Sequence, residues 1–407
     1  MHFNHTITEN AEHTLKILFF CASLEAGRDG VGDYTTRLAG ELRSQGHKSW
    51  IIAINDRHLQ PAPGFESNAG AVDRMQMDSR LSSSTGWLQR IRTIQRAVVE
   101  YQPDWVSLQY VPYGFHRKGL PFLLPRSLAS LGGGFRWHVM FHELWYGDAP
   151  GRRWKHSIIY GLQRHIVQCL LRKLHPLVHT HNELFRGRLH KLGARPAVLP
   201  LFGNIPVVES PAEPWGEFGF FSESELHGIL KCGVFGSVHP GSIPISILSE
   251  LVEVADQQGK KIIFIHFGGI GGAGGLDVWT SVMSNLPASA RSVVLGPQSP
   301  EKISAILQHI DVGLATTPLS IAGKSGTVVA MHDHGVPVIF GAPDPFHAKQ
   351  YPSGCFPPTR EGVDRALAME RPFPRDSVPE VCQQFLADLK RAQCGGRRQK
   401  TIRQQAL

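Results

Sequence analysis

Short, nearly unbroken apolar runs alternate with longer segments of helical hydrophobic spacing along most of the chain. Each run has the length and composition of a strand buried on both faces, as in a parallel sheet that is covered by helices. In the N-terminal half these runs are LKILFFCAS, KSWIIAI, WVSLQYV, RWHVMFHE, LVHTH and AVLPLFG. In the C-terminal half they are LKCGVFGS, KIIFIHF, SVVLG, DVGLATT and VPVIFG. The alternation predicts α/β domains with parallel sheets.

The alternation is interrupted near the middle of the chain. The segment VVESPAEPWGEFGFFSESEL is rich in proline, glycine and acid, which indicates a linker. A chain of 407 residues also exceeds the length that one core usually spans. We therefore predict two doubly wound Rossmann-like domains that face a cleft. The predicted parts are an N-terminal domain (1–207), a linker (208–229), a C-terminal domain (230–375), and a C-terminal helix with a basic tail (376–407), the helix packing back on the N-terminal domain.

Three glycines precede a helical pattern between the first two predicted strands, in GRDGVGDYTTRLAGELRSQGH (Gly27–His47). The apolar face of this helix would consist of Val31, Tyr34, Thr35, Leu38, Ala39 and Leu42. A glycine loop there would leave bare N–H groups at the positive end of the helix dipole, which suits a phosphate or another anion. Gly30 and Gly32 are therefore candidate anion contacts.

The composition is that of a globular enzyme, with 42% hydrophobic and 19% charged residues. No segment approaches the ~18 consecutive apolar residues of a membrane span, and the N-terminus lacks the basic start and apolar core of a secretory signal. We therefore expect a cytoplasmic protein. The six cysteines are scattered, and HTH and HDH have no carboxylate or cysteine at ligand spacing, so we expect no metal site.

Positive charge is concentrated between Gly86 and Arg195, where 17 Lys and Arg face five Asp and Glu. Such a field favours an anionic partner: a nucleotide sugar, a phospholipid or a nucleic acid. No nucleic-acid-binding module is present, so nucleic acid is the least favoured of the three. The basic segment Arg153–Leu174 has an apolar stripe, and it predicts either a packed helix or one that lies on an anionic membrane.

Two glycine-containing segments invite comparison with nucleotide-binding motifs. FGGIGGAGG contains G-x-G-x-x-G at Gly269, Gly271 and Gly274, but the next predicted strand ends without the acidic residue that binds a ribose. GKS at Gly323–Ser325 is similar to the end of a P-loop, but Pro318 occupies the required earlier glycine position. A dinucleotide-dependent enzyme and a P-loop nucleotidase are both disfavoured.

Several segments, in order along the chain, resemble those of GT-B glycosyltransferases, in particular glycosyltransferase family 4. GVGDYTTRLAGELRSQGH is similar to that family's first glycine loop and helix, which meet the donor phosphates, and HVMFHE to the strand that carries a catalytic-site histidine. The other similar segments are WVSLQYVPYGF, HTHNELFRGRL, VFGSVHP, VVLGPQSPEKISAILQHIDVGL and AMHDHGVPVI. The resemblance spans about Leu15 to Ala342. It implies transfer of a sugar from a nucleoside-diphosphate sugar, held mainly by the C-terminal domain, to an acceptor held by the N-terminal domain, with no cofactor besides this donor substrate.

The usual donor-binding side chains of the resembled family are missing. Counted back from the GVP segment, its two spaced glutamates fall on Ala322 and Ala330, and its arginine after the glycine of VFGS falls on Ser237. A lysine and bare N–H groups before a helix, at 324–327, can bind a diphosphate instead. The predicted donor-binding residues are Gly30, Gly32, Gly236, Ser237, Lys324, Ser325, Gly326 and Thr327.

His142 ends a predicted strand and precedes Glu143. A histidine there can orient an acceptor or donate to the sugar as charge develops, and a glutamate can act as a general base. Either residue can instead stabilise a packed turn. Tyr110, Tyr113 and His116 are predicted to lie on the loop after WVSLQYV, where they can contact an acceptor or be half-buried.

These observations predict a metal-independent, hexosyltransferase-type glycosyltransferase of polysaccharide or glycoconjugate assembly, acting on a glycan, lipid-linked or other acceptor. Peripheral contact with the inner membrane is an option that the basic segment leaves open. Two alternatives remain. One is a non-catalytic GT-B scaffold or regulatory partner, because both glutamates are missing. The other is a nucleotide-sugar epimerase on the same fold, which would need carboxylates in the cleft.

Overall fold

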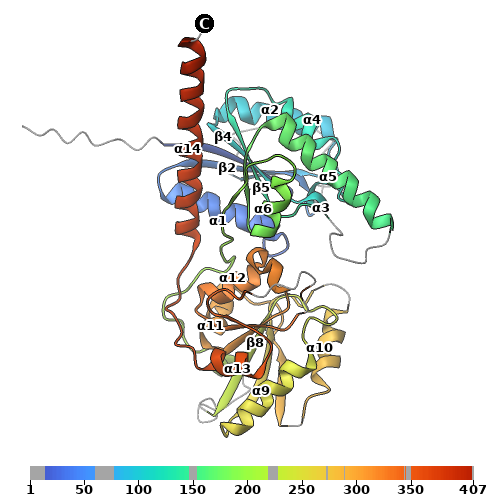
Figure 1. The fold of residues 1–407 in the computed structure, drawn as a ribbon, viewed down its shortest axis with the longest axis vertical. Helices are drawn as coiled ribbons and strands as arrows, with labels where there is room; N and C mark the ends of the chain where they lie inside the picture. The colour runs from blue at the N-terminus through green and yellow to red at the C-terminus, as the bar shows by residue number, and fades with distance from the viewer. Residues whose placement is uncertain are drawn as a thin grey trace, which may run out of the picture. The chain divides into compact units, whose positions relative to one another are not determined.

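The computed structural model describes residues 14–59, 78–145, 154–218, 228–271, 274–287, 289–342, 344 and 350–405, with side chains throughout except at 154–156 and 395–405. Part of the predicted linker (219–227) and the predicted start of the basic helix at Arg153 lie outside these residues. The chain forms two compact units, one of residues 1–145 and 161–178 and the other of residues 146–160 and 179–407. It contains two parallel sheets with helices packed around them, which confirms the predicted class of two Rossmann-like domains (Figure 1).

The first sheet has seven strands in the order β3-β2-β1-β4-β5-β6-β7. Its strands are β1 (Lys16–Cys21), β2 (Lys48–Asp56), β3 (Asp78–Ser82), β4 (Trp105–Tyr110), β5 (Arg136–Phe141), β6 (Leu177–Thr180) and β7 (Ala197–Val198). The pairing is parallel where the register is defined; for example, Phe19 of β1 lies beside Ile51 of β2 and Ser107 of β4. The strand order reverses between β1 and β4. Ligands of open α/β sheets bind beyond the carboxyl ends of the strands at such a point.

The helices around this sheet follow from their apolar faces. They are α1 (Gly30–Ser44), α2 (Trp87–Tyr101), α3 (Pro112–Phe115), α4 (Leu124–Ala129), α5 (Trp154–Leu174) and α6 (Glu183–His190). The predicted face of α1 is buried at Tyr34, Thr35, Leu38, Ala39 and Leu42. The helix packs on β1 and β2, so the loop before it opens at the carboxyl end of β1.

The second sheet has six strands in the order β10-β9-β8-β11-β12-β13. Its strands are β8 (Ile229–Phe235), β9 (Lys261–Phe267), β10 (Ala290–Val294), β11 (Val312–Ala315), β12 (Val338–Phe340) and β13 (Cys355–Phe356), and every determined pairing is parallel. The strand order reverses between β8 and β11. A short helix, α7 (Trp215–Phe218), precedes this sheet in the chain. The helices of this sheet are α9 (Ile245–Gln257), α10 (Gly275–Met283), α11 (Pro300–His309), the 3-10 helix η1 (Leu319–Lys324), α12 (Gly326–Asp333) and α13 (Arg360–Leu367).

The last helix, α14 (Val378–Gln405), contacts the β6 and β7 edge of the first sheet. Asp388 accepts a hydrogen bond from His179 of β6 at 3.0 Å, and the Phe385 ring lies 6.2 Å from the His179 ring. Gln384 donates to the Val198 carbonyl of β7 at 2.9 Å. Within the described residues, no helix has the length and apolarity needed to cross a membrane.

Candidate functional site

The carboxyl ends of β8 and β11 meet where the order of the second sheet reverses. Gly236 follows β8 with a φ of +86°, a left-handed backbone conformation that favours glycine. A Cβ placed on Gly236 would lie 2.8 Å from Thr327 Cγ2 at the start of α12. The fold therefore places Gly236 against Thr327, two residues that the sequence analysis selected independently.

Three hydroxyl groups lie next to one another at this position. Thr317 Oγ1 is 3.1 Å from Ser325 Oγ, which is 3.1 Å from Thr327 Oγ1. Ser325 is the N-cap of α12, and its side chain makes no cap hydrogen bond to the helix. A helix N-terminus flanked by hydroxyl donors is a favourable environment for phosphate oxygens.

The neighbouring glycine loop after β9 completes this region. Ser237 accepts a hydrogen bond through its carbonyl from Thr316 Oγ1 at 2.8 Å. A Cβ on Gly271 would lie 3.1 Å from Ser237 Cβ, so the two loops are in contact. We refer to the residues at these strand ends as the switch-point cluster: Gly236, Ser237, Thr317, Ser325 and Thr327. Thr316 and Thr317 were not predicted as site residues, although they end the run DVGLATT and directly follow β11 (Val312–Ala315).

Lys324 ends η1 and is half-buried. Its Nζ lies 5.4 Å from the ring centroid of Phe185 on α6. Burial lowers the pKa of His181 to about 3, and the nearby charge of Lys324 contributes to that shift. The ammonium group is thus placed toward α6, and its predicted contact with a donor diphosphate remains a prediction.

The two positions of the missing glutamates are occupied by packed alanines. Ala322 is 6% exposed and Ala330 is fully buried. A Cβ on Gly203 would lie 3.0 Å from the Ala330 Cα, so the backbone approaches this helix closely. The same glycine donates its N–H to Asp333 Oδ2 at 3.0 Å. At the position of the second glutamate, the backbone of Gly203 therefore packs closely against α12.

The first glycine loop differs from its predicted form. Asp29 is the N-cap of α1, and its Oδ1 accepts from the N–H groups of Val31 at 3.0 Å and Gly32 at 3.2 Å. These N–H groups are therefore not bare, and the carboxylate beside them disfavours a phosphate. A Cβ on Gly32 would lie 2.5 Å from the Ser23 carbonyl oxygen, so packing alone requires this glycine. Donor binding by Gly30 and Gly32 stays a prediction, without the bare N–H groups that suggested it.

His142 follows β5 directly and is only 7% exposed. Its Nε2 lies 2.9 Å from Gln109 Oε1, Gln109 Nε2 donates to Ser107 Oγ at 2.7 Å, and Ser107 Oγ lies 2.8 Å from His138 Nδ1. We call His142, Gln109, Ser107 and His138 the buried polar chain. Because the Gln109 amide donates through Nε2, its Oε1 accepts from His142 Nε2–H. The neutral imidazole of His142 then carries its lone pair on Nδ1.

The ring of His142 is also held by α1. The Tyr34 and His142 rings are 4.9 Å apart in an edge-to-face arrangement. An imidazole whose tautomer and orientation are both fixed can accept a hydrogen bond or a proton from a sugar hydroxyl. Glu143 is half-buried, and its N–H lies 3.5 Å from the Tyr110 carbonyl; its predicted role as a general base remains a prediction.

The sequence analysis missed three members of the buried polar chain because it interpreted both strands as simply apolar. The available signal was the spacing. Ser107 and Gln109 are two residues apart and so share a face of β4. Ser107 is also the register partner of His138 on β5.

The predicted position of Tyr110 on the loop after β4 is wrong, and its contact with an acceptor remains a prediction. Tyr110 is the last residue of β4 and is fully buried, with its ring 6.1 Å from that of Phe115 and 5.4 Å from that of Phe141. This burial raises the pKa of its hydroxyl. Tyr110 belongs to the core, because it lies within the predicted run WVSLQYV and ends the strand rather than starting the loop that follows.

Tyr113 on α3 and His116 after it are exposed, as an acceptor contact requires. Arg57 donates to the Tyr113 carbonyl at 2.7 Å. His116 Nδ1 accepts from the N–H groups of Lys118 and Leu120, both at 3.2 Å, and so shapes the loop that follows. Contact of either residue with an acceptor remains a prediction.

The basic helix α5 is packed in the fold along the C-terminal half of its apolar stripe, whereas Ile158 near its start is 54% exposed. Its buried residues include Gln163, Ile166, Val167 and Leu170. Gln163 donates to the Gly119 carbonyl at 3.1 Å, which ties α5 to the loop after α3. Of the two predicted alternatives, the packed helix agrees with these contacts.

Comparison with known proteins identifies a family that matches part of the sequence and solved structures of similar fold. Residues 29–204 match the family described as Glycosyl transferase 4-like domain. No curated protein sequence matches the chain. Among solved structures, HepE from Anabaena in complex with UDP and glucose is 13% identical, with a TM-score of 0.57 over 92% of this chain and 99% of that one.

Two other solved structures have the same architecture. Sucrose-phosphate synthase from Thermosynechococcus elongatus is 12% identical, with a TM-score of 0.56 over 95% of this chain and 100% of that one. The UDP-GlcNAc 2-epimerase from Methanocaldococcus jannaschii is 12% identical, with a TM-score of 0.52 over 92% and 99%. These comparisons confirm the GT-B fold and the resemblance to glycosyltransferase family 4.

Proposed function

We propose that this GT-B protein, which carries a glycosyl transferase 4-like domain at residues 29–204, transfers a sugar from a nucleoside-diphosphate sugar to an acceptor in polysaccharide or glycoconjugate assembly. The observation that carries the proposal is the switch-point cluster. Its residues gather at the edge of the second sheet where α/β proteins bind nucleotides. The N-terminal part of the chain would hold the acceptor.

The donor diphosphate would bind at the start of α12. Its oxygens would accept from the Ser325 and Thr327 hydroxyls and from N–H groups of the first helical turn. Lys324 would add a positive charge by leaving the Phe185 ring. A cation–π contact at a partly exposed site contributes about 0.5–1 kcal/mol, whereas a hydrogen bond to a charged group contributes about 1.5–3 kcal/mol, so this exchange is favourable. Because HepE was crystallised with UDP and glucose, UDP is the first nucleotide to test.

His142 would act on the reacting sugar. The buried polar chain fixes its Nε2–H on Gln109, so Nδ1 is the nitrogen that would meet a hydroxyl of donor or acceptor. Such a group acts mainly in the transition state. Transfer would require no metal ion in this scheme, because the helix N-terminus and Lys324 would stabilise the leaving diphosphate.

The experiment is to measure nucleoside-diphosphate release from UDP-, GDP-, ADP- and TDP-sugars. We expect one donor to be turned over, and His142→Ala to reduce kcat by ~10²-fold or more while donor affinity stays within a few-fold. His165→Ala removes an exposed histidine of α5 and serves as the control. Parental turnover in His142→Ala would remove this residue from the chemistry.

Chromatography of the nucleotide sugars in the same reactions separates the alternatives. An epimerase, which the structural similarity to UDP-GlcNAc 2-epimerases keeps in consideration, would interconvert two nucleotide sugars without an acceptor. A non-catalytic scaffold would turn over none of the four donors even at high protein concentration. Either result would contradict the proposed function.

A further inference from the structure

A surface hollow of about 750 Å³ lies beside the carboxyl end of β2, away from the buried polar chain. The charged side chains that line it are all positive: Arg57, Arg90, Arg117 and Lys118. Its apolar wall includes Trp87, Phe115, Leu120, Phe122 and Leu123. We call this feature the basic hollow. Its four cations have no carboxylate among the lining residues, so the hollow carries a strongly positive field.

Arg90 is a buried cation whose hydrogen-bond partners are neutral. Its side chain donates to the Ile54 carbonyl at 2.8 Å and to Asn55 Oδ1 at 2.7 Å, and it lies 4.9 Å from the Trp87 ring. The residue is 7% exposed, and its Nε has no hydrogen-bond partner. No carboxylate pairs with Arg90 anywhere in the described part of the chain. A buried guanidinium without a counter-charge is costly, and an anion in the hollow would supply that charge.

Arg57 and Arg117 add like charges at the rim of the hollow. Burial lowers the pKa of Arg57, and the charge of Arg117 lowers it further, so the two guanidinium groups are close enough to repel each other. Arg57 is nevertheless held in place by the Tyr113 carbonyl at 2.7 Å. Asp29 acts on the pKa of Arg57 in the opposite direction, but more weakly than burial and Arg117. An arginine that the backbone fixes close to a second arginine suits an anion site.

The apolar wall distinguishes this hollow from a simple phosphate site. Phe122 is 51% exposed and Leu123 is 64% exposed, directly after the two cations of the 117–118 segment. Large apolar side chains that stay in water beside cations indicate a ligand that has an apolar part.

We propose that the basic hollow binds an amphipathic anion, a phosphate or diphosphate carried on a hydrocarbon chain. The phosphate lies at Arg57, Arg90 and Arg117, and the chain lies along Phe122 and Leu123. His116, a predicted acceptor residue, lines the same hollow. The inference therefore rests on the proposed function, and it names the acceptor as a lipid-linked phosphate.

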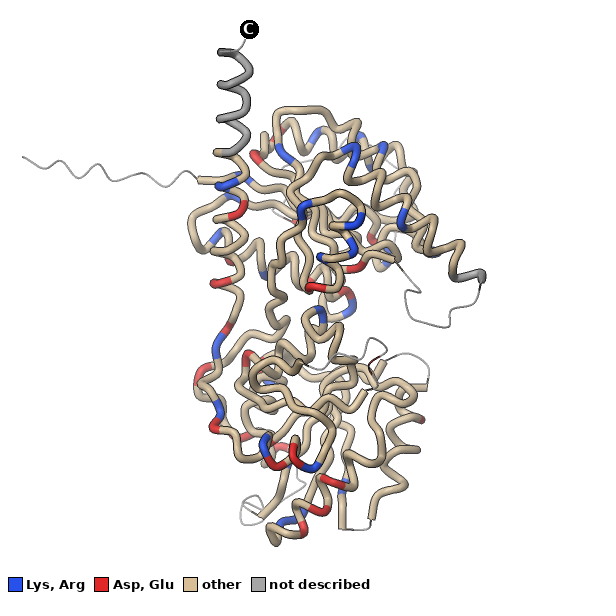
Figure 2. Tube along the Cα trace, in the orientation of Figure 1, with Lys and Arg blue, Asp and Glu red and all other residues tan. Residues whose placement is uncertain are grey.

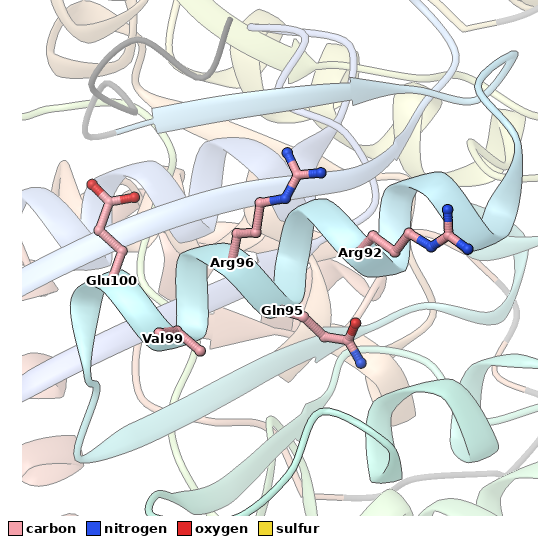
Figure 3. Close-up of a pocket in the computed structure, with 5 residues that line it drawn as sticks. All are labelled: Arg92, Gln95, Arg96, Val99 and Glu100. Atoms are coloured by element: carbon pink, nitrogen blue, oxygen red, sulfur yellow. The ribbon is translucent and has the colours of Figure 1, made fainter. Parts of the chain in front are cut away.

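The test uses isothermal titration of the full chain with dodecyl phosphate below its micellar concentration. Inorganic diphosphate and dodecyl maltoside are the charge-only and chain-only probes. We expect dodecyl phosphate to bind at least tenfold more tightly than either, and Arg117→Ala/Lys118→Ala to weaken it at least tenfold. The matched control is Arg92→Ala/Arg96→Ala, which removes two cations from the separate outer face of α2 shown in Figure 3 and should change the affinity less than twofold. If the first double variant loses its circular dichroism spectrum, Arg117→Ala alone replaces it.

Equal binding by the parent and the Arg117→Ala/Lys118→Ala protein, or equal weakening in both double variants, would overturn the proposal. Binding to phosphatidylglycerol vesicles without binding of monomeric dodecyl phosphate would also overturn it, in favour of a membrane surface. Failure of the proposed function is distinguishable from these results. A protein that binds dodecyl phosphate through the basic hollow but turns over no nucleotide sugar keeps the inferred site and loses the transferase assignment.

Discussion

His142 takes its chemical character from a glutamine on the neighbouring strand. Gln109 is 1% exposed, and both ends of its amide are used, one for His142 and one for Ser107. Leaving either partner unsatisfied in the buried environment costs ~1–3 kcal/mol, so the chain of hydrogen bonds favours one tautomer of His142 strongly. Gln109 thus acts as a positioning residue in the proposed mechanism.

The two glycines of the first loop should respond differently to substitution. A Cβ at position 32 would meet the Ser23 carbonyl at 2.5 Å, and this backbone atom cannot move aside alone. Gly30 is exposed at the first residue of α1, and its φ is not positive. We expect Gly32→Ala to lower the free energy of unfolding by ~1–3 kcal/mol, and Gly30→Ala to leave it unchanged or raise it by ~0.4–1 kcal/mol.

Thermal unfolding of both variants checks this expectation, since ~1 kcal/mol shifts the melting temperature by roughly 2–4 °C in a domain of this size. Equal melting temperatures for the two variants would mean that the loop relaxes around the added methyl group. Gly30→Ala is therefore also the cleaner variant for asking whether this loop contacts the donor.

At the scale of elements, the sequence predicted those strands whose burial is carried by apolar side chains. All eleven predicted runs correspond to strands in the structure. Among the described residues, the strands that were not predicted are β3 and β13, which lie at sheet edges. The β3 sequence, DSRLS, has no fully buried residue, and the two residues of β13 stand between Gly354 and Pro357 without the longer apolar run that surrounds β7. Their pairing is set by neighbouring strands, and a local pattern does not contain that information.

The candidate site was predictable only where it follows strand ends. The switch-point cluster could be found because Gly236 and the 324–327 segment directly follow or precede regular elements. The hydrogen bonding and packing of the first glycine loop could not be predicted, because the Asp29 cap and the Ser23 contact depend on how the loop folds back. The basic hollow likewise joins Arg57 and Arg90 to the segment that begins at Phe115, a tertiary contact that no local periodicity reveals.

The edge formed by β2 and β3 is held by an ion pair whose strength depends on pH. Asp56 accepts from Arg80 Nε at 2.7 Å and from the N–H groups of Leu24 at 3.1 Å and His58 at 3.0 Å. These hydrogen bonds outweigh the opposing effect of burial and lower the pKa of Asp56 to about 2. The unfolded carboxyl has a pKa of about 3.9. The stabilisation is therefore complete above about pH 4 and is lost as the pH falls toward 2.

We expect Asp56→Asn to lower the free energy of unfolding at pH 7 by ~1–2 kcal/mol, allowing for partial solvent screening. The difference from the parent should disappear near pH 2. Asp78→Asn breaks the more exposed ion pair between Asp78 of β3 and Arg43 of α1, and it is the control, with an expected effect of ~0–1 kcal/mol. Urea denaturation from pH 2 to 7 measures both. A difference that is independent of pH would contradict the role assigned to the ion pair.

At the scale of the molecule, the excess of positive charge and the candidate donor site belong to different parts of the sequence. Figure 2 marks Lys and Arg along α2, α5 and α6, in the part of the sequence where cations exceed acids. The basic hollow belongs to this part, which would bind an anionic acceptor. The second sheet lacks the family's paired glutamates, and its candidate donor site is built from hydroxyls, backbone and one lysine instead.

The central claim is that a nucleoside diphosphate binds at the switch-point cluster with the help of Lys324. Isothermal titration of UDP, GDP, ADP and TDP into the parent, Lys324→Ala and Lys302→Ala proteins tests it most directly. Lys302 lies on α11 in an ion pair with Glu217 at 2.5 Å and is the lysine control of the same unit. We expect one nucleotide to bind the parent, Lys324→Ala to weaken its binding more than tenfold, as expected for losing ~1.5–3 kcal/mol, and Lys302→Ala to leave its binding unchanged. Equal affinity in the parent and Lys324→Ala, or no binding of any of the four nucleotides, would contradict it.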